Sequence, residues 1–196
     1  MKLKNFKDVS RLFINIDMVN GFIKCGVMHD KNIAKIIKEQ IELIERCKEE
    51  DDLLVFVKEG HCENAIEFNK FPKHCIKGTE EAEIVDELLP FAKDAKVYQK
   101  NSTSAIFAKD FLTDVASMIN LKEVVLMGCC TDICVLNLAL PLANYFDEKN
   151  KQVNIVVPMN VVQTYDSPNH NKDEYNDIAF KLMRQAGIKV VENYIK

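Results

Sequence analysis

Short apolar runs alternate along the chain with longer segments in which apolar residues recur every three or four positions. The apolar runs predict six strands, at residues 11–17, 53–57, 96–98, 124–127, 153–157 and 188–191. The periodic segments predict five helices, at residues 30–50, 80–89, 105–119, 134–146 and 172–186. Strands that alternate with helices in this way form a mostly parallel sheet that helices cover on both faces. We therefore expect an α/β fold with three layers (α/β/α), a central, mostly parallel six-stranded sheet and a Rossmann-like topology.

Four residues define expected ends and faces of these helices. Asp30 can cap the first helix through its carboxylate. Pro90 is expected to end the second helix, and Pro141 to kink the fourth, because proline interrupts the helical hydrogen bonds. Phe107 falls on the apolar side of the third helix and is therefore expected to be buried.

Composition and charge exclude some classes of partner. At 196 residues the chain is long enough to bury a three-layer core, so we expect a single domain spanning residues 1–196. Hydrophobic residues make up 47% and charged residues 29%, which is ordinary for a soluble globular protein. The net charge of −4, with lysines spread along the sequence, argues against a nucleic-acid or anionic-membrane partner.

Cysteine usage and the apolar runs indicate the compartment. Seven cysteines are an odd number, and their spacing suggests no disulfide framework, so reduced thiols are expected. No apolar run approaches the ~20 residues of a membrane span. The first eight residues contain no apolar core of signal-peptide length. We expect a cytoplasmic protein with no membrane partner.

The turn at residues 128–135 is the first candidate for chemistry, because it links an apolar strand to a helix. Gly128 allows a sharp turn, and Thr131 or Asp132 can cap the helix that follows. A cysteine in the first helical turn faces unpaired N–H groups and the positive end of the helix dipole, which favour the thiolate. Cys134 is therefore the candidate nucleophile.

Four reactive side chains follow predicted strands. Asp17, Glu59, Lys100 and Cys134 each come just after a strand. In a parallel α/β sheet, sites lie at the carboxyl ends of the strands. We expect these groups to converge, with an acid to accept the cysteine proton and a lysine to stabilise the thiolate. The alternative is that Asp17 caps a turn, Lys100 is solvated and Cys134 is a small core residue.

Cysteine chemistry of two other kinds stays open. Cys129, Cys130 and Cys134 lack the paired C-x-x-C spacing of a structural zinc site, so that reading has weak support. A redox pair is also conceivable, but the usual two-residue gap is absent.

The long segment after the second strand offers metal ligands. Glu59, His61, Glu67 and His74 would give mixed nitrogen and oxygen ligation, which suits Zn, Fe or Mn. Considered alone, the segment could equally be a polar surface loop. A further polar cluster, before the last helix, is expected to be only a loop and a helix cap: Asp166, His170 and Asp173.

Three sequence blocks resemble the isochorismatase-like cysteine hydrolases, and they occur in that family's order. The blocks are Asp-x-x-Asn-x-Phe at 17–22, Lys100 ahead of Ser104-Ala105, and Gly-x-x-Thr-Asp-x-Cys-Val at 128–135. The resemblance covers nearly the whole chain, and the last block is the most specific. Residues 59–83 are similar to the metal-binding segment of the nicotinamidase and pyrazinamidase subgroup. The resemblance implies an isochorismatase-like fold and a single cysteine hydrolase domain.

The resemblance also implies roles for individual residues. Asp17 would take the proton of Cys134, and Lys100 would stabilise the thiolate and hold Asp17 ionised. The thiolate would attack a carboxamide to form a thioester. The backbone N–H groups of Cys130 and Cys134 would form the oxyanion hole, with a cis peptide between Cys129 and Cys130.

The family's metal and pocket positions carry over with two departures. The residues in these positions are Glu59, His61 and His74 as metal ligands, Glu67 as a further candidate ligand, and Phe22 and Phe71 in the ring pocket. A divalent ion is implied, with Zn first and Fe or Mn as alternatives. Glu59 stands where aspartate is usual, and Thr103 stands where tyrosine is frequent. Both departures bear on the substrate more than on the reaction type.

The resulting expectation is an amidohydrolase that converts nicotinamide to nicotinate and ammonia through a Cys134 thioester. One alternative is a related cysteine hydrolase that acts on another amide or on a ureido substrate. Another is a non-catalytic protein that retains the pocket. Isochorismate cleavage is less favoured, because those relatives generally lack the nucleophilic cysteine. The expected partners are a small-molecule amide and further copies of the chain, as a homo-oligomer.

Overall fold

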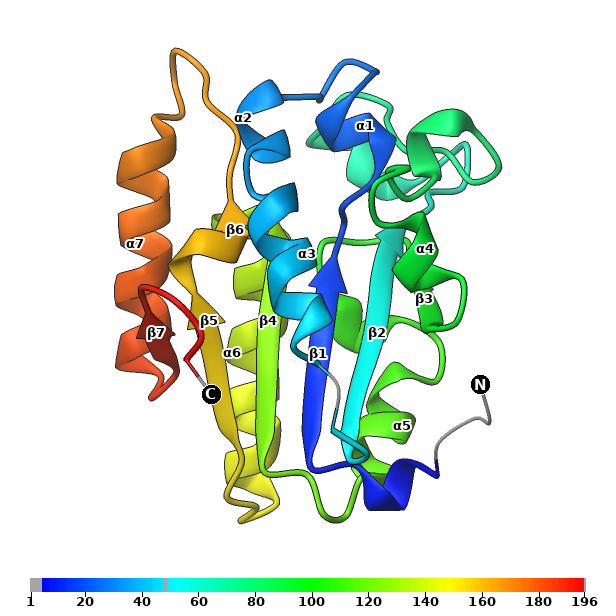
Figure 1. Ribbon diagram of the computed structural model, residues 1–196. Coiled ribbons are helices and arrows are strands. Elements are labelled where there is room, and N and C mark those ends of the chain that lie inside the picture. Colours follow the sequence, from blue (N-terminus) through cyan, green and yellow to red (C-terminus); the bar gives the residue numbers. More distant parts are fainter. Residues whose placement is uncertain (1–4, 48, 196) are drawn as a thin grey trace.

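A seven-stranded sheet forms the centre of the computed structural model, which describes residues 5–47 and 49–195. The order is β3-β2-β1-β4-β5-β7, with β6 beside β4, and every pairing is parallel. The strands are β1 Arg11–Ile16, β2 Asp52–Glu59, β3 Lys96–Lys100, β4 Glu123–Cys129, β5 Asn154–Pro158, β6 Val162–Gln163 and β7 Lys189–Val191. The three-layer, mostly parallel fold is confirmed (Figure 1). The expected six strands become seven because β6, with two residues, is too short to give a sequence pattern.

Helices cover both faces of this sheet (Figure 1). They are α1 Asn20–Ile23, α2 Lys31–Ala34, α3 Ile37–Glu45, α4 Leu89–Ala92, α5 Phe111–Ser117, α6 Leu136–Glu148 and α7 Lys172–Gln185. Buried side chains of α5, α6 and α7 share one apolar core with Leu12 and Ile14 of β1. Phe13 of the same strand packs in a second core with α1 to α4. Because β1 is buried on both faces, its sequence is a continuous apolar run.

The first predicted helix is interrupted in the structure. Asp30 caps α2 as expected, since its carboxylate accepts a hydrogen bond of 2.7 Å from the N–H of Asn32. The chain then turns at Lys35 and Ile36 before α3 begins. The prediction of one continuous helix over 30–50 is therefore wrong, although its apolar face does cover the sheet.

Two other helix predictions are wrong for local reasons. Residues 80–88 contain only a 3₁₀ turn, Glu80–Ala82, and α4 begins at Leu89. Pro90 lies in the first turn of α4, where a backbone N–H has no helical hydrogen bond to make, so proline does not end the helix there. The segment 105–119 is split into a 3₁₀ turn, Ala105–Phe107, and α5, because Asp110 adopts a left-handed φ of 65°. Phe107 is consequently 82% exposed and not buried.

The sheet order brings the ends of β1, β2, β3 and β4 together at one edge. Glu59 at the end of β2 pairs with Lys100 at the end of β3. Ile16 at the end of β1 pairs with Gly128 near the end of β4. Asp17 follows β1 directly, and its N–H donates to the carbonyl of Val57 on β2 at 2.9 Å. The order in which successive strands are added to the sheet reverses between β1 and β4, and such a switch point is where ligands bind in open parallel sheets.

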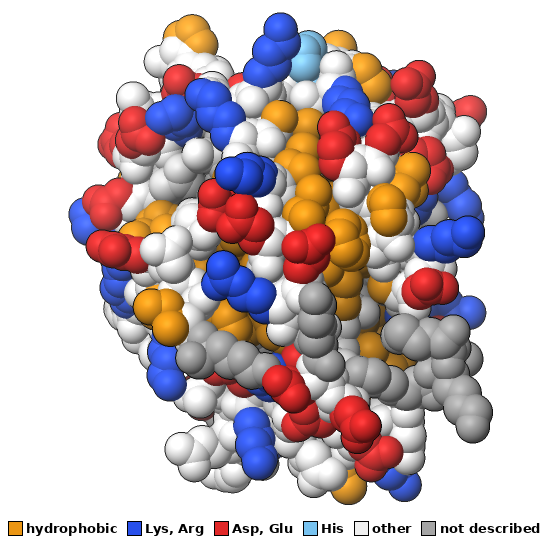
Figure 2. Space-filling model, in the orientation of Figure 1, with side chains coloured by type: hydrophobic (Ala, Val, Ile, Leu, Met, Phe, Trp, Pro, Cys, Tyr) orange, Lys and Arg blue, Asp and Glu red, His pale blue; other side chains and the backbone are white. Residues whose placement is uncertain are grey.

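The surface carries both charges and apolar groups. Acidic and basic side chains are interspersed over the face shown in Figure 2, with hydrophobic side chains visible between them. Several large apolar side chains are exposed, among them Val27, Ile66 and Phe107. Among the helices of the described residues, none combines the length and the apolar character needed to cross a bilayer.

Gly128 fixes how closely β1 and β4 approach at the edge that carries the reactive residues. It adopts φ 127°, and a Cβ at this position would lie 2.0 Å from the carbonyl oxygen of Ile16. Only glycine avoids both the strained backbone and the overlap.

We expect Gly128→Ala to lower the free energy of unfolding by roughly 3 kcal/mol or more, because backbone strain and overlap add together. Gly187→Ala is the matched control, since Gly187 also has a positive φ of 78° but no atom within 4 Å of the added Cβ. That control should lose only about 1–2 kcal/mol. Urea unfolding of both variants tests this, and equal losses would contradict the proposed contact.

Candidate active site

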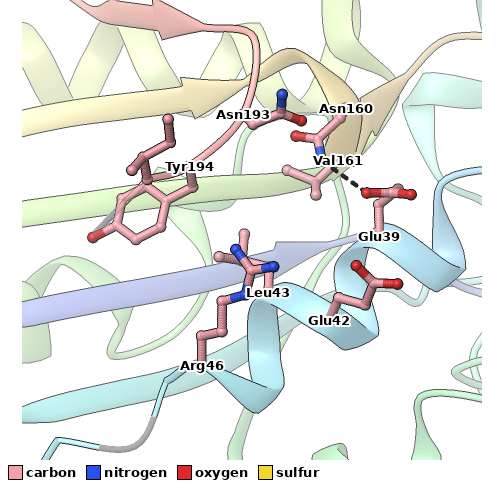
Figure 3. A pocket seen from close by; sticks show the side chains of 9 residues that line it. Glu39, Glu42, Leu43, Arg46, Asn160, Val161, Asn193 and Tyr194 are labelled. Carbon is pink, nitrogen blue, oxygen red and sulfur yellow. Dashed lines mark hydrogen bonds between the residues drawn. The ribbon is translucent and has the colours of Figure 1, made fainter.

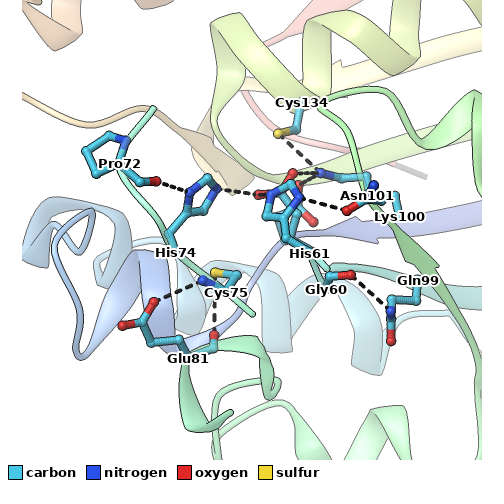
Figure 4. Close-up of polar contacts among 12 residues, drawn as sticks. Gly60, His61, Pro72, His74, Cys75, Glu81, Gln99, Lys100, Asn101 and Cys134 are labelled. Carbon is cyan, nitrogen blue, oxygen red and sulfur yellow. Dashed lines mark hydrogen bonds and ion pairs between the residues drawn. The ribbon is translucent and has the colours of Figure 1, made fainter. Parts of the chain in front are cut away.

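The ammonium group of Lys100 lies among three reactive side chains, all of them buried. Its Nζ is 2.8 Å from Oδ2 of Asp17 and 3.6 Å from Sγ of Cys134. The same nitrogen contacts Oε1 of Glu59 (Figure 4). The four strand-end residues that the sequence singles out therefore meet at one point. This geometry disfavours the alternative of a solvated lysine and a turn-capping aspartate.

Burial and charge set the protonation of these groups. Burial raises the pKa of Asp17 to about 6, with Lys100 opposing the rise and Glu59 adding to it. Burial alone would lower the pKa of Lys100, but Asp17, Cys134 and Glu59 hold it well above its usual value. Lys100 is therefore a cation, and at neutral pH Asp17 is mostly ionised and can accept a proton.

Cys134 rests as a thiol. Burial raises the pKa of Cys134 well above its usual value, and Lys100 opposes this while Asp17 and Glu59 reinforce it. A thiolate would add a third negative charge next to a single ammonium. The start of the helix favours the thiolate, but burial and the two neighbouring carboxylates oppose it. The proton must leave as the sulfur attacks, and Asp17 is the adjacent acceptor.

The strand-to-helix turn has an unusual backbone. The peptide between Cys129 and Cys130 is cis. Residues Thr131–Val135 form a π-helical turn ahead of α6. The carbonyl of Cys130 accepts hydrogen bonds of 3.1 Å from the N–H groups of Ile133 and Val135, so these bonds bypass the N–H of Cys134.

The expected cap on this turn is absent. The residue at the cap position is Cys130, and no side chain makes a capping hydrogen bond there. Among the described residues, the hydroxyl of Thr131 is buried without a hydrogen-bond partner. The carboxylate of Asp132 instead accepts a hydrogen bond from His170, a residue far along the chain.

A second cluster adjoins the cysteine. Ligand atoms of Glu59, His61, Glu67 and His74 all lie within 4.8 Å of one another. Oε2 of Glu59 is 3.2 Å from Nε2 of His74 and 3.5 Å from Nε2 of His61, and Figure 4 shows the two imidazoles side by side. These are the four residues that the sequence singles out as metal ligands, and they come from the end of β2 and the segment that follows it.

The cluster fits a divalent ion. Nε2 of His61 is buried without a hydrogen-bond partner among the described residues. The opposite ring nitrogens are held in place, because Nδ1 of His74 lies 2.8 Å from the carbonyl of Pro72 and Nδ1 of His61 lies 3.3 Å from Oδ1 of Asn101. Such outer contacts orient metal-binding imidazoles. Two imidazole nitrogens and two carboxylates are a donor set that Zn, Fe or Mn accepts.

One pocket joins the cysteine to the histidine cluster. Its lining residues are Phe22, Met28, Glu59, Glu67, Phe71, His74, Thr103, Cys130, Ile133, Cys134 and Tyr165. The rings of Phe22 and Phe71 lie 5.5 and 6.4 Å from the His74 ring, between centroids. The pocket therefore offers flat apolar walls between a nucleophile and a metal cluster.

Some lining residues were not foreseen from the sequence. Met28 and Tyr165 lie in loops outside the recognised motifs, and Ile133 occupies a position that the motif of the turn leaves unspecified. Tyr165 comes two residues after β6. Had that short strand been recognised, Tyr165 would have been a candidate for the same reason as Asp17 and Lys100, which also lie at strand ends.

A different pocket, between α3 and the C-terminal segment, has a volume of about 240 Å³ (Figure 3). Its polar residues include Glu39, Arg46 and Asn160, and the Asn160 amide donates to Glu39 at 3.1 Å. Neither a cysteine nor a histidine lines it. The chemistry therefore belongs to the pocket at the strand ends.

Known proteins share this architecture. The Isochorismatase domain family matches residues 11–193. Nicotinamidase 1 of Arabidopsis thaliana is 28% identical over 184 residues, which cover 84% of this chain and 73% of that protein. The crystal structure of nicotinamidase PncA from Bacillus subtilis has a TM-score of 0.77 and 26% identity, covering 94% of this chain and 100% of that one. A pyrazinamidase of Pyrococcus horikoshii in complex with zinc has a TM-score of 0.75 and 26% identity, covering 93% and 99%.

The chain belongs to the isochorismatase family, in its nicotinamidase and pyrazinamidase subgroup. It is an amidohydrolase, an enzyme that cleaves amide carbon–nitrogen bonds. The buried thiol, carboxylate and ammonium are the groups such a reaction requires.

The metal cluster can be tested by composition. We expect the purified protein to carry about one Zn, Fe or Mn per chain, and the His61→Ala/His74→Ala double variant to lose it, because two nitrogen ligands disappear. His29→Ala is the matched control, since His29 is exposed and outside the cluster. Metal analysis after gel filtration provides the measurement. Full retention of the ion by the double variant would rule out this ligand set.

Proposed function

We propose that this enzyme hydrolyses nicotinamide to nicotinate and ammonia through a thioester on Cys134, within one cysteine hydrolase domain spanning residues 1–196. The observation that carries the proposal is a single pocket whose lining includes Cys134, the cluster residues Glu59, Glu67 and His74, and the rings of Phe22 and Phe71. A pyridine carboxamide has the matching features: a flat ring, a ring nitrogen and a carboxamide at a separate position on the ring.

Attack on the carboxamide begins at Cys134. Asp17 takes the thiol proton, and the sulfur forms a bond to the carboxamide carbon while the carbonyl electrons move to oxygen. Lys100, 3.6 Å from the sulfur and 2.8 Å from Asp17, stabilises the developing thiolate and keeps the carboxylate oriented. The backbone N–H groups of Cys130 and Cys134 would donate to the oxyanion, and the turn's own hydrogen bonds bypass the N–H of Cys134.

Asp17 acts in both later steps, the departure of the amine and the hydrolysis of the thioester. As the oxyanion collapses, the carbon–nitrogen bond breaks, and ammonia leaves with the proton that Asp17 had accepted. Water then attacks the thioester carbon and gives a proton to Asp17. As the carbon–sulfur bond breaks, that proton passes to the sulfur, which restores the Cys134 thiol and the Asp17 carboxylate and releases the carboxylic acid, which ionises in water. A single aspartate next to one lysine is therefore sufficient for both half-reactions.

The remaining residues bind and orient the substrate. Phe22 and Phe71 would hold the ring between them. Glu59, His61, His74 and Glu67 would hold a divalent ion, zinc first. When bound, the ion supplies a Lewis-acid site for the pyridine nitrogen, which places the carboxamide opposite Cys134.

A second candidate substrate class follows from two residues. Glu59 is one methylene longer than the aspartate usual in the subgroup, and Thr103 is smaller than the tyrosine often found there; both line the pocket. A different amide or a ureido compound would suit a pocket reshaped in this way. Assembly as a homo-oligomer and a cytoplasmic location stay predictions from the sequence.

We expect Cys134→Ala to lower kcat for ammonia release from nicotinamide by at least roughly 10³-fold with the fold intact, because no other group can form the acyl intermediate. Cys62→Ala is the matched control, since Cys62 is exposed and outside the pocket. Ammonia is measured with nicotinamide, pyrazinamide and an N-carbamoyl amino acid, each with and without chelator. Substantial turnover by Cys134→Ala would rule out Cys134 as the nucleophile. If the wild-type enzyme preferred the ureido compound, nicotinamide would be ruled out as the main substrate.

A further inference from the structure

His170 is buried in the loop that leads into α7, between two tyrosine rings. The centroid of its ring lies 3.8 Å from that of Tyr165, with 11° between the planes. On the other face, the ring of Tyr175 from α7 lies 3.7 Å away at 25°. His170 itself is only 6% exposed. The three rings form a continuous stack, so the position of the imidazole is fixed from both sides.

Both ring nitrogens of His170 face oxygen acceptors. Nε2 lies 2.9 Å from Oδ2 of Asp132, and Nδ1 lies 3.0 Å from the carbonyl oxygen of Tyr165. Both distances are within hydrogen-bond range, so the edge of the ring is held by the turn residue Asp132 and by the backbone of Tyr165, while the two tyrosine rings hold its faces.

The two partners of His170 are both parts of the reaction site. Asp132 lies two residues before Cys134 in the π-helical turn, and α7 packs against that turn. Tyr165 lines the pocket together with Cys130 and Cys134. His170 itself is not among the residues that line the pocket. His170 can therefore affect the reaction only indirectly, through Asp132 in the turn and through Tyr165 in the pocket wall.

We propose that His170 is a positioning residue, which holds the nucleophile turn through Asp132 and the substrate wall through Tyr165. The role as stated rests on the proposed function, because it assumes Cys134 as nucleophile and the adjoining pocket as the binding site. The need for such support is visible in the turn. No side chain caps its start, and the carboxylate of Asp132 ties the turn to the loop that leads into α7.

Two substitutions separate the two contacts. His170→Phe keeps a ring between the tyrosines but removes both ring nitrogens, so the contacts to Asp132 and to the Tyr165 carbonyl are lost while the stack is retained. We expect kcat to fall about 10–100-fold, because small displacements of a reacting atom have effects of this size, while KM stays within about twofold. His170→Gln keeps a donor for Asp132 but removes the stack, so KM should rise more than kcat falls.

A double-mutant cycle tests whether His170 acts through Asp132. If it does, the His170→Phe/Asp132→Asn double variant should have a kcat no lower than the worse of the two single variants. His29→Gln is the matched control, because His29 is exposed and outside both the stack and the pocket. Additive losses, or wild-type kcat in a folded His170→Phe variant, would overturn the proposal.

Two further readouts distinguish positioning from general stability and from the substrate assignment. Zinc binding should be unchanged in His170→Phe, because the ligand cluster lies in another segment; a parallel loss of zinc and thermal stability would indicate a merely structural role and overturn the proposal.

Alkylation of Cys134 by iodoacetamide, located by peptide mass spectrometry, needs no substrate. It should slow about tenfold as the Lys100 contact to sulfur loosens. Slowed alkylation in a protein inert toward nicotinamide would support the role of His170 and reject only the substrate.

Discussion

A lysine ammonium buried among carboxylates is the constraint on which the site depends. Removing a cation from water is costly unless opposite charges and hydrogen bonds replace the solvent. Lys100 satisfies this with Asp17 and Glu59. The three residues lie at the ends of β3, β1 and β2, and the strand order β3-β2-β1-β4 places these ends side by side. The same order delivers Cys134 from the turn after β4. The sheet topology is therefore what makes a stable buried charge and a reactive thiol neighbours.

Glu59 links the two halves of the pocket. One of its oxygens contacts Lys100, and the other lies between the imidazoles of His61 and His74. Burial is the main cause of the raised pKa of Cys134, and the two carboxylates, Asp17 and Glu59, add to it while Lys100 opposes it. A divalent cation at the histidine cluster would offset part of the negative charge of Glu59. Metal binding and ionisation of the thiol are therefore coupled through this one side chain.

How far the sequence predicts this arrangement depends on the range of the interactions. Strands buried on both faces leave apolar runs, and reactive residues directly after them were correctly expected to converge. Local breaks were missed where a backbone conformation decided the outcome, as at Asp110, which exposes Phe107. Long-range partners leave no pattern. Nothing adjacent to His170 reveals its contact with Asp132, and Tyr165 follows a strand of only two residues.

The central claim is that acyl transfer passes through the sulfur of Cys134. Mixing the enzyme with nicotinamide, quenching in acid during the first turnovers and measuring intact and peptide masses tests this most directly. The account predicts a mass increase of one nicotinoyl group, located at Cys134 and removed by hydroxylamine as a thioester would be. Ammonia formed in excess over enzyme with an adduct on another residue, or with no adduct at any quench time, would contradict it.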